Sequence, residues 1–250
     1  MIIDFHVHGK ITKKFPFDKE RFLEIINEAK EGGLDSLAVT EHCHSNNFLE
    51  GYEFLNSNYK LIEDYYDIDG FKVFYGMEVT TEQKLDILII GKPKLIIELR
   101  NEIIKTLKDK DFIDIKHLFK LQLSNELLII LAHPYRDYLE FPSLESYILN
   151  KIDAIEINSK DLYKNGIETM KEKVEKLANK LNLPIVCGSD THHFMQMASI
   201  KNVFNSDCKT VKRIKEEIKI KDYRIELSPD LRVRVKSAII IKKLICKNNI

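Results

Sequence analysis

Short apolar runs of strand length recur along this chain of 250 residues, and most of the intervals between them have the apolar spacing of helices. The runs are residues 2–8, 36–42, 71–79, 85–91, 127–133, 153–158 and 184–189. The helical patterns are residues 18–31 and about 94–108, 114–123, 143–150, 166–181 and 209–220. Strands that alternate with helices are typical of a parallel sheet. We therefore expect all seven runs to be parallel strands.

Seven such strands suit an α/β fold of the distorted (β/α)7 barrel type, closed or nearly closed. Runs such as "LLIILAH" are apolar on both faces, which fits strands buried between a barrel interior and surrounding helices. The alternative is an open doubly wound sheet. Neither GxGxxG nor GxxxxGK[ST] follows any of the runs, which weakens a nucleotide-binding form of that alternative.

The C-terminal part of the chain has a different pattern. After about residue 205 we expect a helix, a short strand "YRIEL" and a basic helix near 230–247. We interpret residues 1–205 as the barrel domain and residues 206–250 as a small helical appendage packed on it. The basic residues of this appendage are expected to form a solvated helix face.

Composition narrows the class of protein. Lys+Arg and Asp+Glu both number 39, so the net charge is zero, and the simplest case for a nucleic-acid or membrane-surface protein is absent. A local basic patch is not excluded. The four cysteines form no CxxC pair, and no apolar run approaches the length of a membrane span. Asp4 also stands where a signal peptide would need apolar residues. We expect a cytoplasmic protein with no membrane partner.

Histidines and carboxylates gather at the ends of the expected strands. In "IIDFHVHG", alternation places Asp4, His6 and His8 on one strand face. Seven of the eight histidines lie at or just after the carboxyl end of a run, namely His6, His8, His42, His44, His133, His192 and His193. Glu41, Glu78 and Asp190 lie in the same places. The carboxyl ends of barrel strands meet at one face, so we predict a shared metal-binding pocket there.

The ligand types indicate the metals. Imidazole nitrogen together with carboxylate oxygen suits zinc, manganese or iron, and the absence of a thiolate cluster argues against a structural zinc site. More than four candidate ligands implies two or three divalent metal ions. Multinuclear sites of this kind cleave phosphate esters, because one ion activates water while another holds the phosphoryl oxygens.

Five motifs in order, "DFHVH", "TEH", "GMEV", "AHP" and "GSDTHH", resemble those of the polymerase and histidinol phosphatase (PHP) family. The resemblance covers about residues 2–195. It implies a distorted (β/α)7 barrel, a di- or trinuclear zinc, manganese or iron site, and phosphoester hydrolysis. Stand-alone members of that family include histidinol phosphatases and nucleotide phosphatases, and other members are domains of DNA polymerases.

The resemblance also implies roles for single residues. The first metal would be held by the side chains of His6, His8, Glu78 and Asp190. Glu78 would bridge to a second metal that His133 also binds, and a third would take His42 and His192. Asp4 would orient an imidazole through its other ring nitrogen. Asp190 and His192 would also act in catalysis, with His192 a candidate proton donor. Arg136 could hold the phosphate with its fork of N–H groups.

Two departures from the family pattern affect the second and third metals. The family usually has His or Asp where this chain reads "GKITKKF", so Lys13 or Lys14 falls near a ligand position. A His is common after the fourth strand, where "LIIGKPK" offers only Gly91, Lys92 and Pro93. His44, His193 or His117 could substitute. The ammonium of Lys14 could also stand in for the third cation.

The expected function is therefore hydrolysis of a small phosphomonoester, histidinol-phosphate-like or a nucleotide, by metal-activated water. One alternative is a nucleotide or oligonucleotide phosphodiesterase or exonuclease, with nucleic acid as the substrate. Another is a catalytically impaired metal-binding module with a regulatory role, which the two missing ligands would favour. The sequence leaves the substrate, the native metal and the oligomeric state open.

Overall fold

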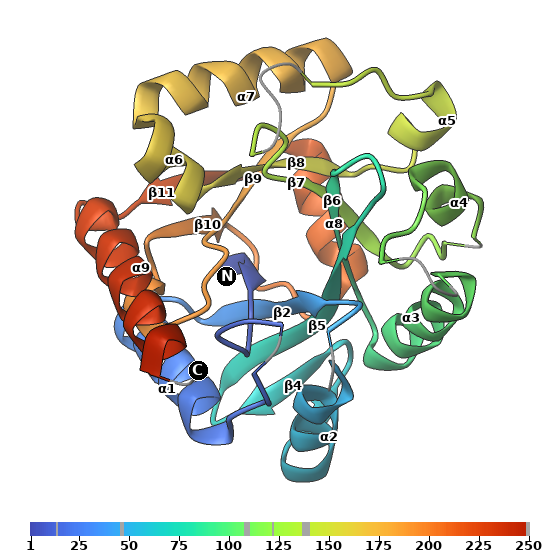
Figure 1. Cartoon of the computed structure of the whole chain (residues 1–250). Helices are drawn as coiled ribbons and strands as arrows, with labels where there is room; N and C mark the ends of the chain where they lie inside the picture. Colours follow the sequence, from blue (N-terminus) through green and yellow to red (C-terminus); the bar gives the residue numbers. More distant parts are fainter. Residues whose placement is uncertain (14, 46–47, 108–110, 122, 137–140, 249–250) are drawn as a thin grey trace.

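In the part of the chain that the structure describes, one sheet of eleven strands curls into a nearly closed barrel with helices around its outside (Figure 1). The structure is a computed structural model, and it describes residues 1–250 apart from 14, 46–47, 108–110, 122, 137–140 and 249–250. The strands are β1 (Ile2–Val7), β2 (Ser36–His42), β3 (Lys60–Ile62), β4 (Tyr65–Ile68), β5 (Phe71–Thr80), β6 (Asp86–Gly91), β7 (Leu128–Ala132), β8 (Ala154–Asn158), β9 (Ile185–Gly188), β10 (Ile200–Phe204) and β11 (Tyr223–Leu227). Their order is β11-β10-β1-β2-β5-β6-β7-β8-β9, with the β3–β4 hairpin joined to β5. This architecture confirms the predicted distorted α/β barrel.

Seven of the helices in the described part of the chain fall where apolar spacing predicts them, with shorter ends in several cases. The described helices are α1 (Lys19–Glu31), α2 (Phe48–Asn58), α3 (Pro93–Leu107), α4 (Ile115–Lys120), α5 (Ser146–Leu149), α6 (Ser159–Asn165), α7 (Ile167–Leu181), α8 (Val211–Ile220) and α9 (Leu231–Asn248), with a 3-10 turn η1 (Phe194–Gln196). Helices α2 and α6 were not predicted. Asp18 caps α1, because its carboxylate accepts the backbone N–H groups of Glu20 and Arg21. Within the described residues, none of these helices has the length and apolar character that a membrane crossing would need.

The direction of β6 differs from the prediction. Residues 85–91 were expected to run parallel to their neighbours, but β6 is antiparallel to both β5 and β7. Only residues 81–85 connect β5 to β6, whereas a parallel crossover needs about a dozen residues or more. Thr81 closes the turn, since its backbone N–H donates to the Leu85 carbonyl over 2.9 Å. The reversal places Asp86, the first residue of β6, opposite Thr80 at the end of β5.

The barrel closes between β9 and β1 through a few backbone contacts and one side chain. His8 N–H donates to the Thr191 carbonyl over 2.8 Å, and Asp190 N–H donates to the His6 carbonyl over 2.8 Å. The buried Asn202 amide donates to the carbonyls of Ile3 and Cys187 and accepts the Cys187 N–H. Asn202 therefore links the first strand to the last strand of the barrel.

A register irregularity in β1 decides where its side chains point. The pairing of β1 with β2 shifts between Asp4 and Val7. Ile3 and Phe5 belong to the buried apolar cluster that also contains Phe74 and Leu128, whereas Val7 belongs to the other cluster. Simple alternation would have kept Ile3, Phe5 and Val7 on one face. The irregularity therefore separates the surroundings of Val7 from those of Ile3 and Phe5.

The C-terminal segment joins the sheet. β10, which the sequence analysis did not predict, pairs antiparallel with β1, and β11 pairs antiparallel with β10. The apolar side of α8 belongs to the same buried cluster as the inner faces of the strands. Helix α9 lies against α6 and η1 (Figure 1). The pairing of β10 with β11 makes residues 223–227 part of the common sheet. The domain boundary near residue 205 stays a prediction.

Candidate metal centre

The structure brings all seven predicted ligands together at one end of the barrel. His6 lies in β1 and His8 directly after it, His42 ends β2, Glu78 lies in β5, and the others follow β7 and β9, namely His133, Asp190 and His192. Five of them are buried, while His42 and His192 are partly exposed. Residues far apart in the sequence thus share one pocket, as the strand-end argument predicted.

The Glu78 carboxylate lies in the middle of this cluster, within reach of four imidazoles. Its Oε1 lies 3.1 Å from His133 Nε2 and 3.5 Å from His6 Nε2. Its Oε2 lies 2.7 Å from His42 Nδ1 and 3.5 Å from His8 Nε2. A carboxylate with a different pair of imidazoles on each oxygen is arranged to bridge two cations.

Asp190 joins the cluster to a rim of cationic side chains. Its Oδ1 lies 3.3 Å from His8 Nε2 and 2.9 Å from Lys160 Nζ. Its Oδ2 accepts a hydrogen bond of 2.6 Å from Arg136 NH1. Asp190 therefore connects the ring of imidazoles with two side chains that carry permanent positive charge.

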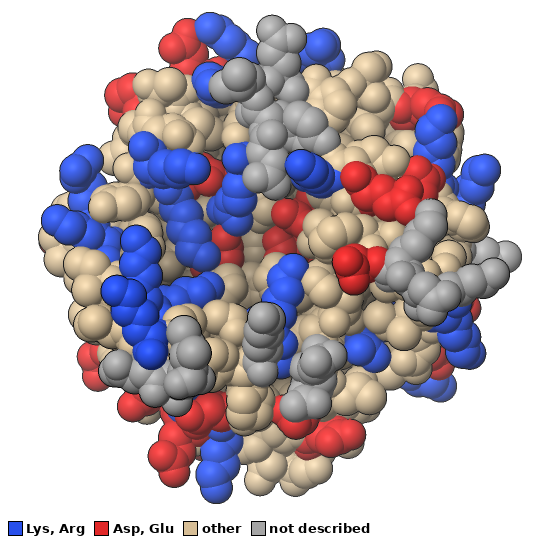
Figure 2. All heavy atoms as spheres, in the orientation of Figure 1, with Lys and Arg blue, Asp and Glu red and all other residues tan. Residues whose placement is uncertain are grey.

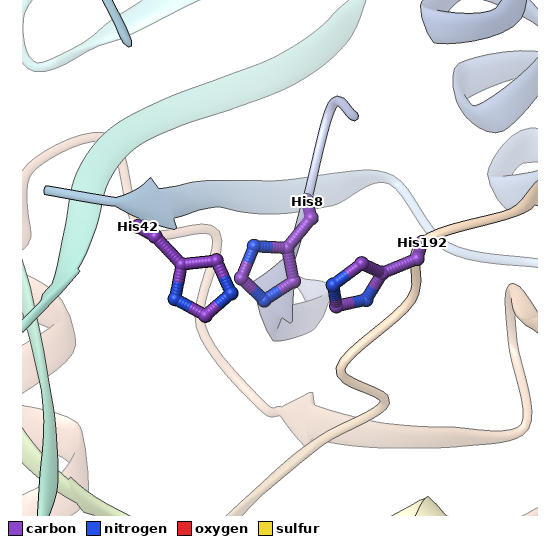
Figure 3. Close-up of side chains that lie close together, drawn as sticks. All are labelled: His8, His42 and His192. Carbon is purple, nitrogen blue, oxygen red and sulfur yellow. The ribbon is translucent and has the colours of Figure 1, made fainter. Parts of the chain in front are cut away.

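Three imidazoles form a second group beside this carboxylate pair. Figure 3 shows the rings of His8, His42 and His192 next to one another. The ring centroid of His8 lies 4.6 Å from that of His42 and 4.1 Å from that of His192. Each ring offers a nitrogen within 4.8 Å of the other two, which is close enough for one ion.

Glu156 is a central residue of the site that the sequence analysis missed. It is fully buried in β8, and its Oε1 lies 2.8 Å from His6 Nδ1. A carboxylate only accepts, so His6 Nδ1 carries the proton and His6 Nε2 is left to face Glu78 and His8. The other oxygen, Oε2, accepts the backbone N–H of His133 over 2.9 Å. The signal was a glutamate within the apolar run "DAIEIN", because a buried charge requires partners.

The role expected for Asp4 is wrong in this structure. Asp4 Oδ1 accepts the backbone N–H groups of His6 and Ser189, each over 3.0 Å. It thereby pins β1 to the residue after β9, and Glu156 takes the orienting contact with the His6 ring. Burial raises the pKa of Asp4 to about 6, although the hydrogen bonds from Ser189 and His6 oppose the shift.

The segment "LIIGKPK", where the family pattern led us to expect a missing histidine ligand, ends away from the candidate metal centre. Because β6 runs antiparallel, Gly91 pairs with Tyr75 near the start of β5, and Pro93 begins α3 beyond it. Asp86 occupies the site end instead, with its Oδ2 3.8 Å from His133 Nδ1. Glu78, Asp86 and His133 together offer three ligand atoms within 4.8 Å of one another.

The other departure from the family pattern is the segment "GKITKKF", with Lys13 or Lys14 near a ligand position. Lys14 lies outside the described residues. Lys13 Nζ lies 2.9 Å from His44 Nε2, so Lys13 borders the pocket next to His42. His193 accepts the N–H of Met195 and caps η1. Neither His44, His193 nor His117 belongs to a group of potential ligands among the described residues.

Backbone strain accompanies the site. His133 has φ +25° and Asp190 has φ +56°, values that residues with a side chain seldom adopt. Both residues directly follow a strand and both carry a candidate ligand. The strain is maintained because the surrounding strands hold the two turns, and it aims both side chains into the pocket.

The electrostatic field of the cluster favours positive charge. Burial by itself would raise the pKa of Glu78, but the neighbouring His42 and His6 outweigh it and hold that pKa well below its usual range. Burial would lower the pKa of His6, yet the carboxylates of Glu156 and Glu78 raise it well above the ordinary value. Buried carboxylates of this kind need cations, which divalent ions can supply.

The residues present fit such ions. His8 Nδ1, His42 Nδ1 and Glu78 Oε2 are buried and make no hydrogen bond within the described part of the chain, although His42 Nδ1 and Glu78 Oε2 are close together. Buried nitrogen and oxygen atoms that lack a hydrogen-bond partner and face one pocket are typical of a metal-binding site. The set is nitrogen and oxygen throughout, as zinc, manganese and iron accept.

Arg136, predicted from the motif "AHPY", has its guanidinium held in place. Its NH1 donates to Asp190, its NH2 donates to Asn158 Oδ1 over 3.0 Å, and its Nε lies 3.3 Å from Asp161 Oδ1. The Arg136 side chain is 28% exposed.

Comparison with known proteins finds likeness in fold and not in sequence. No family model matches the chain, and no curated protein sequence matches it. The structure of PsfC from Pseudomonas syringae PB-5123 is similar with a TM-score of 0.74 and 18% identity, over 98% of each chain. The lesion-specific endonuclease PfuEndoQ from Pyrococcus furiosus gives 0.65 and 20%, over 90% of this chain and 58% of that one.

A further structure, endonuclease Q with a 27-mer duplex substrate that carries an abasic lesion at the active site, gives 0.63 and 20% over 88% of this chain and 57% of that one. Fold and site together therefore define a distorted α/β barrel with a pocket of imidazoles and carboxylates at one end. At these identities the likeness establishes the fold alone.

Proposed function

We propose that this protein is a cytoplasmic, metal-dependent phosphoesterase of the PHP type that hydrolyses a small phosphomonoester. The observation that carries the proposal is the Glu78 carboxylate, which has two imidazoles beside each of its oxygens. The five motif segments that resemble the PHP family supply this cluster. The free state of all four cysteines supports a reducing compartment.

We assign two or three divalent ions, zinc, manganese or iron, to this pocket. The first would take His6, His8, Glu78 and Asp190. The second would take Glu78, His133 and, in place of the expected histidine, Asp86. A third would take His42 and His192 beside His8.

The chain's own residues would bind and orient the substrate at this pocket. When bound, the ions would supply an activated water molecule and neutralise charge on the phosphoryl group. Arg136 would donate to the phosphoryl oxygens from the rim, where its side chain is 28% exposed. Glu156 would keep the His6 ring in the tautomer whose Nε2 can ligate. Burial and the Lys160 ammonium hold the pKa of His192 well below its usual value, which favours a neutral ligand over a proton donor.

A second candidate function is hydrolysis of a phosphodiester in a nucleotide or nucleic acid. The fold likeness to endonuclease Q, a protein described with a DNA duplex as substrate, favours it. Zero net charge favours the monoester. The third candidate function is a metal-binding regulatory module without turnover, which was favoured by two missing metal ligands. Asp86 would supply one of these two ligands, so the argument for this function is weaker.

The experiment is reconstitution of the purified protein with manganese, zinc or iron(II), followed by elemental analysis and assays with p-nitrophenyl phosphate and its bis ester. We expect at least one bound ion per chain and faster hydrolysis of the monoester. Preference for the bis ester would establish the phosphodiesterase. Bound metal with hydrolysis of neither ester would establish the regulatory module, and failure to bind any ion would refute all three.

A further inference from the structure

Helix α9 lies along one side of the barrel (Figure 1). It lies against α6 and η1, and η1 follows the loop that carries His192 (Figure 1). Arg234 NH1 donates to the Met197 carbonyl over 2.9 Å, and the Arg232 guanidinium lies over the Tyr163 ring at 5.8 Å. These contacts fix the helix in position and in rotation about its axis.

Lys242 continues the inward face of this helix. The buried residues of α9 are Leu231, Val235 and Ala238, spaced four and three positions apart. Lys242 follows Ala238 by four positions, so it falls on the same face. The next residue, Lys243, is exposed, whereas Lys242 is half-buried.

The surroundings of Lys242 tie it to the metal centre. Its charge interacts with those of Lys160, Asp190 and Glu41. Burial and the nearby Lys160 ammonium lower the pKa of Lys242 to about 8, although Asp190 and Glu41 oppose the shift. Two ammonium groups on the same side of one reaction pocket repel each other, and an anion that lies close to both offsets this repulsion.

Basic side chains gather on one side of the pocket mouth. Figure 2 shows Lys and Arg side chains over α6 and α9, beside a hollow with acidic side chains in its floor. Helix α9 carries six Lys and Arg residues and no Asp or Glu, in a chain whose net charge is zero. Ions bound at Asp190 and Glu78 would take up the carboxylate charge, which leaves the ammonium groups of Lys160 and Lys242 without a counter-charge.

We infer that Lys242 of α9 and Lys160 of α6 form a second anion subsite at the mouth of the metal centre. The inference rests on the proposed function and names its substrate class: a small phosphoester with another anionic group, carboxylate or phosphate, near the scissile phosphoryl group. The metal ions and Arg136 receive the phosphoryl group, and the subsite receives the second anion. A substrate with one phosphoryl group and an apolar remainder leaves the two ammonium groups unpaired.

Direct binding tests this subsite without reliance on turnover. Calorimetry on the manganese-loaded protein compares ethylphosphonate with 3-phosphonopropionate and with ethane-1,2-bisphosphonate. These ligands share the phosphonate and differ in the second group. The variants are Lys242→Gln and, as a matched control one residue away on the exposed face, Lys243→Gln.

We expect one of the two ligands with a second anionic group to bind about tenfold more tightly than ethylphosphonate, the factor that one charge-assisted hydrogen bond typically supplies. Lys242→Gln should remove most of this preference and leave ethylphosphonate affinity unchanged, while Lys243→Gln should keep the preference. Tighter binding of 3-phosphonopropionate would identify the second anionic group of the substrate as a carboxylate, and tighter binding of ethane-1,2-bisphosphonate would identify it as a phosphate. Equal affinity for all three ligands, or a preference that survives in Lys242→Gln, overturns the inference. A preference without any esterase activity would overturn the proposed function and leave the subsite standing.

Discussion

Glu156 offers the sharpest test of how the metal centre is organised. It has no exposed surface, and its carboxylate contacts the His6 ring, the His133 backbone and the Asn158 side-chain amide. In Glu156→Gln the volume is nearly unchanged, and the amide oxygen can still accept one of these hydrogen bonds. The negative charge that raises the basicity of His6 is lost. The His6 tautomer with its proton on Nδ1 therefore loses the carboxylate that stabilises it most.

The magnitude follows from the contact that is lost. Removal of a carboxylate that orients a ligating histidine typically lowers metal affinity by about 10–100-fold, which corresponds to about 1.4–2.7 kcal/mol. We expect a loss in this range for manganese or zinc, since only His6, among the candidate ligands, depends on Glu156 for its ring orientation. The stoichiometry of metal at saturation should stay the same.

Calorimetric titration of the metal-free protein measures this affinity. Glu168→Gln is the matched control, because the Glu168 side chain is 89% exposed on α7 and lies in none of the potential ligand groups. Circular dichroism checks that both variants fold. A change of less than about twofold in a folded Glu156→Gln protein would refute the orienting role. Loss of one equivalent of bound metal would instead make Glu156 a ligand.

The remaining predictions concern the core of the site and the closure of the barrel. Asn202→Ala should lower the free energy of unfolding by about 3 kcal/mol, because it leaves the buried Cys187 N–H and two carbonyls unpaired. Urea denaturation with an unchanged slope measures this loss. A loss below about 1 kcal/mol would contradict the role of Asn202 in closing the barrel. Gly188→Ala places a Cβ against the Glu156 carboxylate and His6 and should cost about 1–3 kcal/mol with weaker metal binding, whereas Gly51→Ala, whose Cβ would meet Phe17 at 3.5 Å, should cost little. Equal stability of the two glycine variants would count against close packing at β9. Glu78→Gln should reduce bound metal by at least one equivalent in elemental analysis, and full occupancy would disprove the bridging arrangement.

Local pattern in the sequence was enough for much of this molecule. Strand-length apolar runs, the Asp18 cap of α1 and the placement of histidines at strand ends are properties of short segments, and the structure has them where they were expected. The convergence of His8 and His133 followed from one general rule about barrels. The antiparallel direction of β6 could also have been predicted from the sequence, since residues 81–85 are too few for the crossover that a parallel strand requires.

Other features depend on which segments meet in three dimensions. Asp86 reaches the pocket only because β6 is reversed, and Glu156 orients His6 although the two residues lie 150 positions apart in the sequence. Lys242 lies fifty residues after His192, the last candidate ligand in the sequence, and no local pattern connects it with the site. A buried charge is stable only beside its partners, and those partners come from distant strands and helices. The sequence by itself therefore determined many of the helices and strands and most of the candidate ligands, while the tertiary structure decided which charges face one another across the pocket.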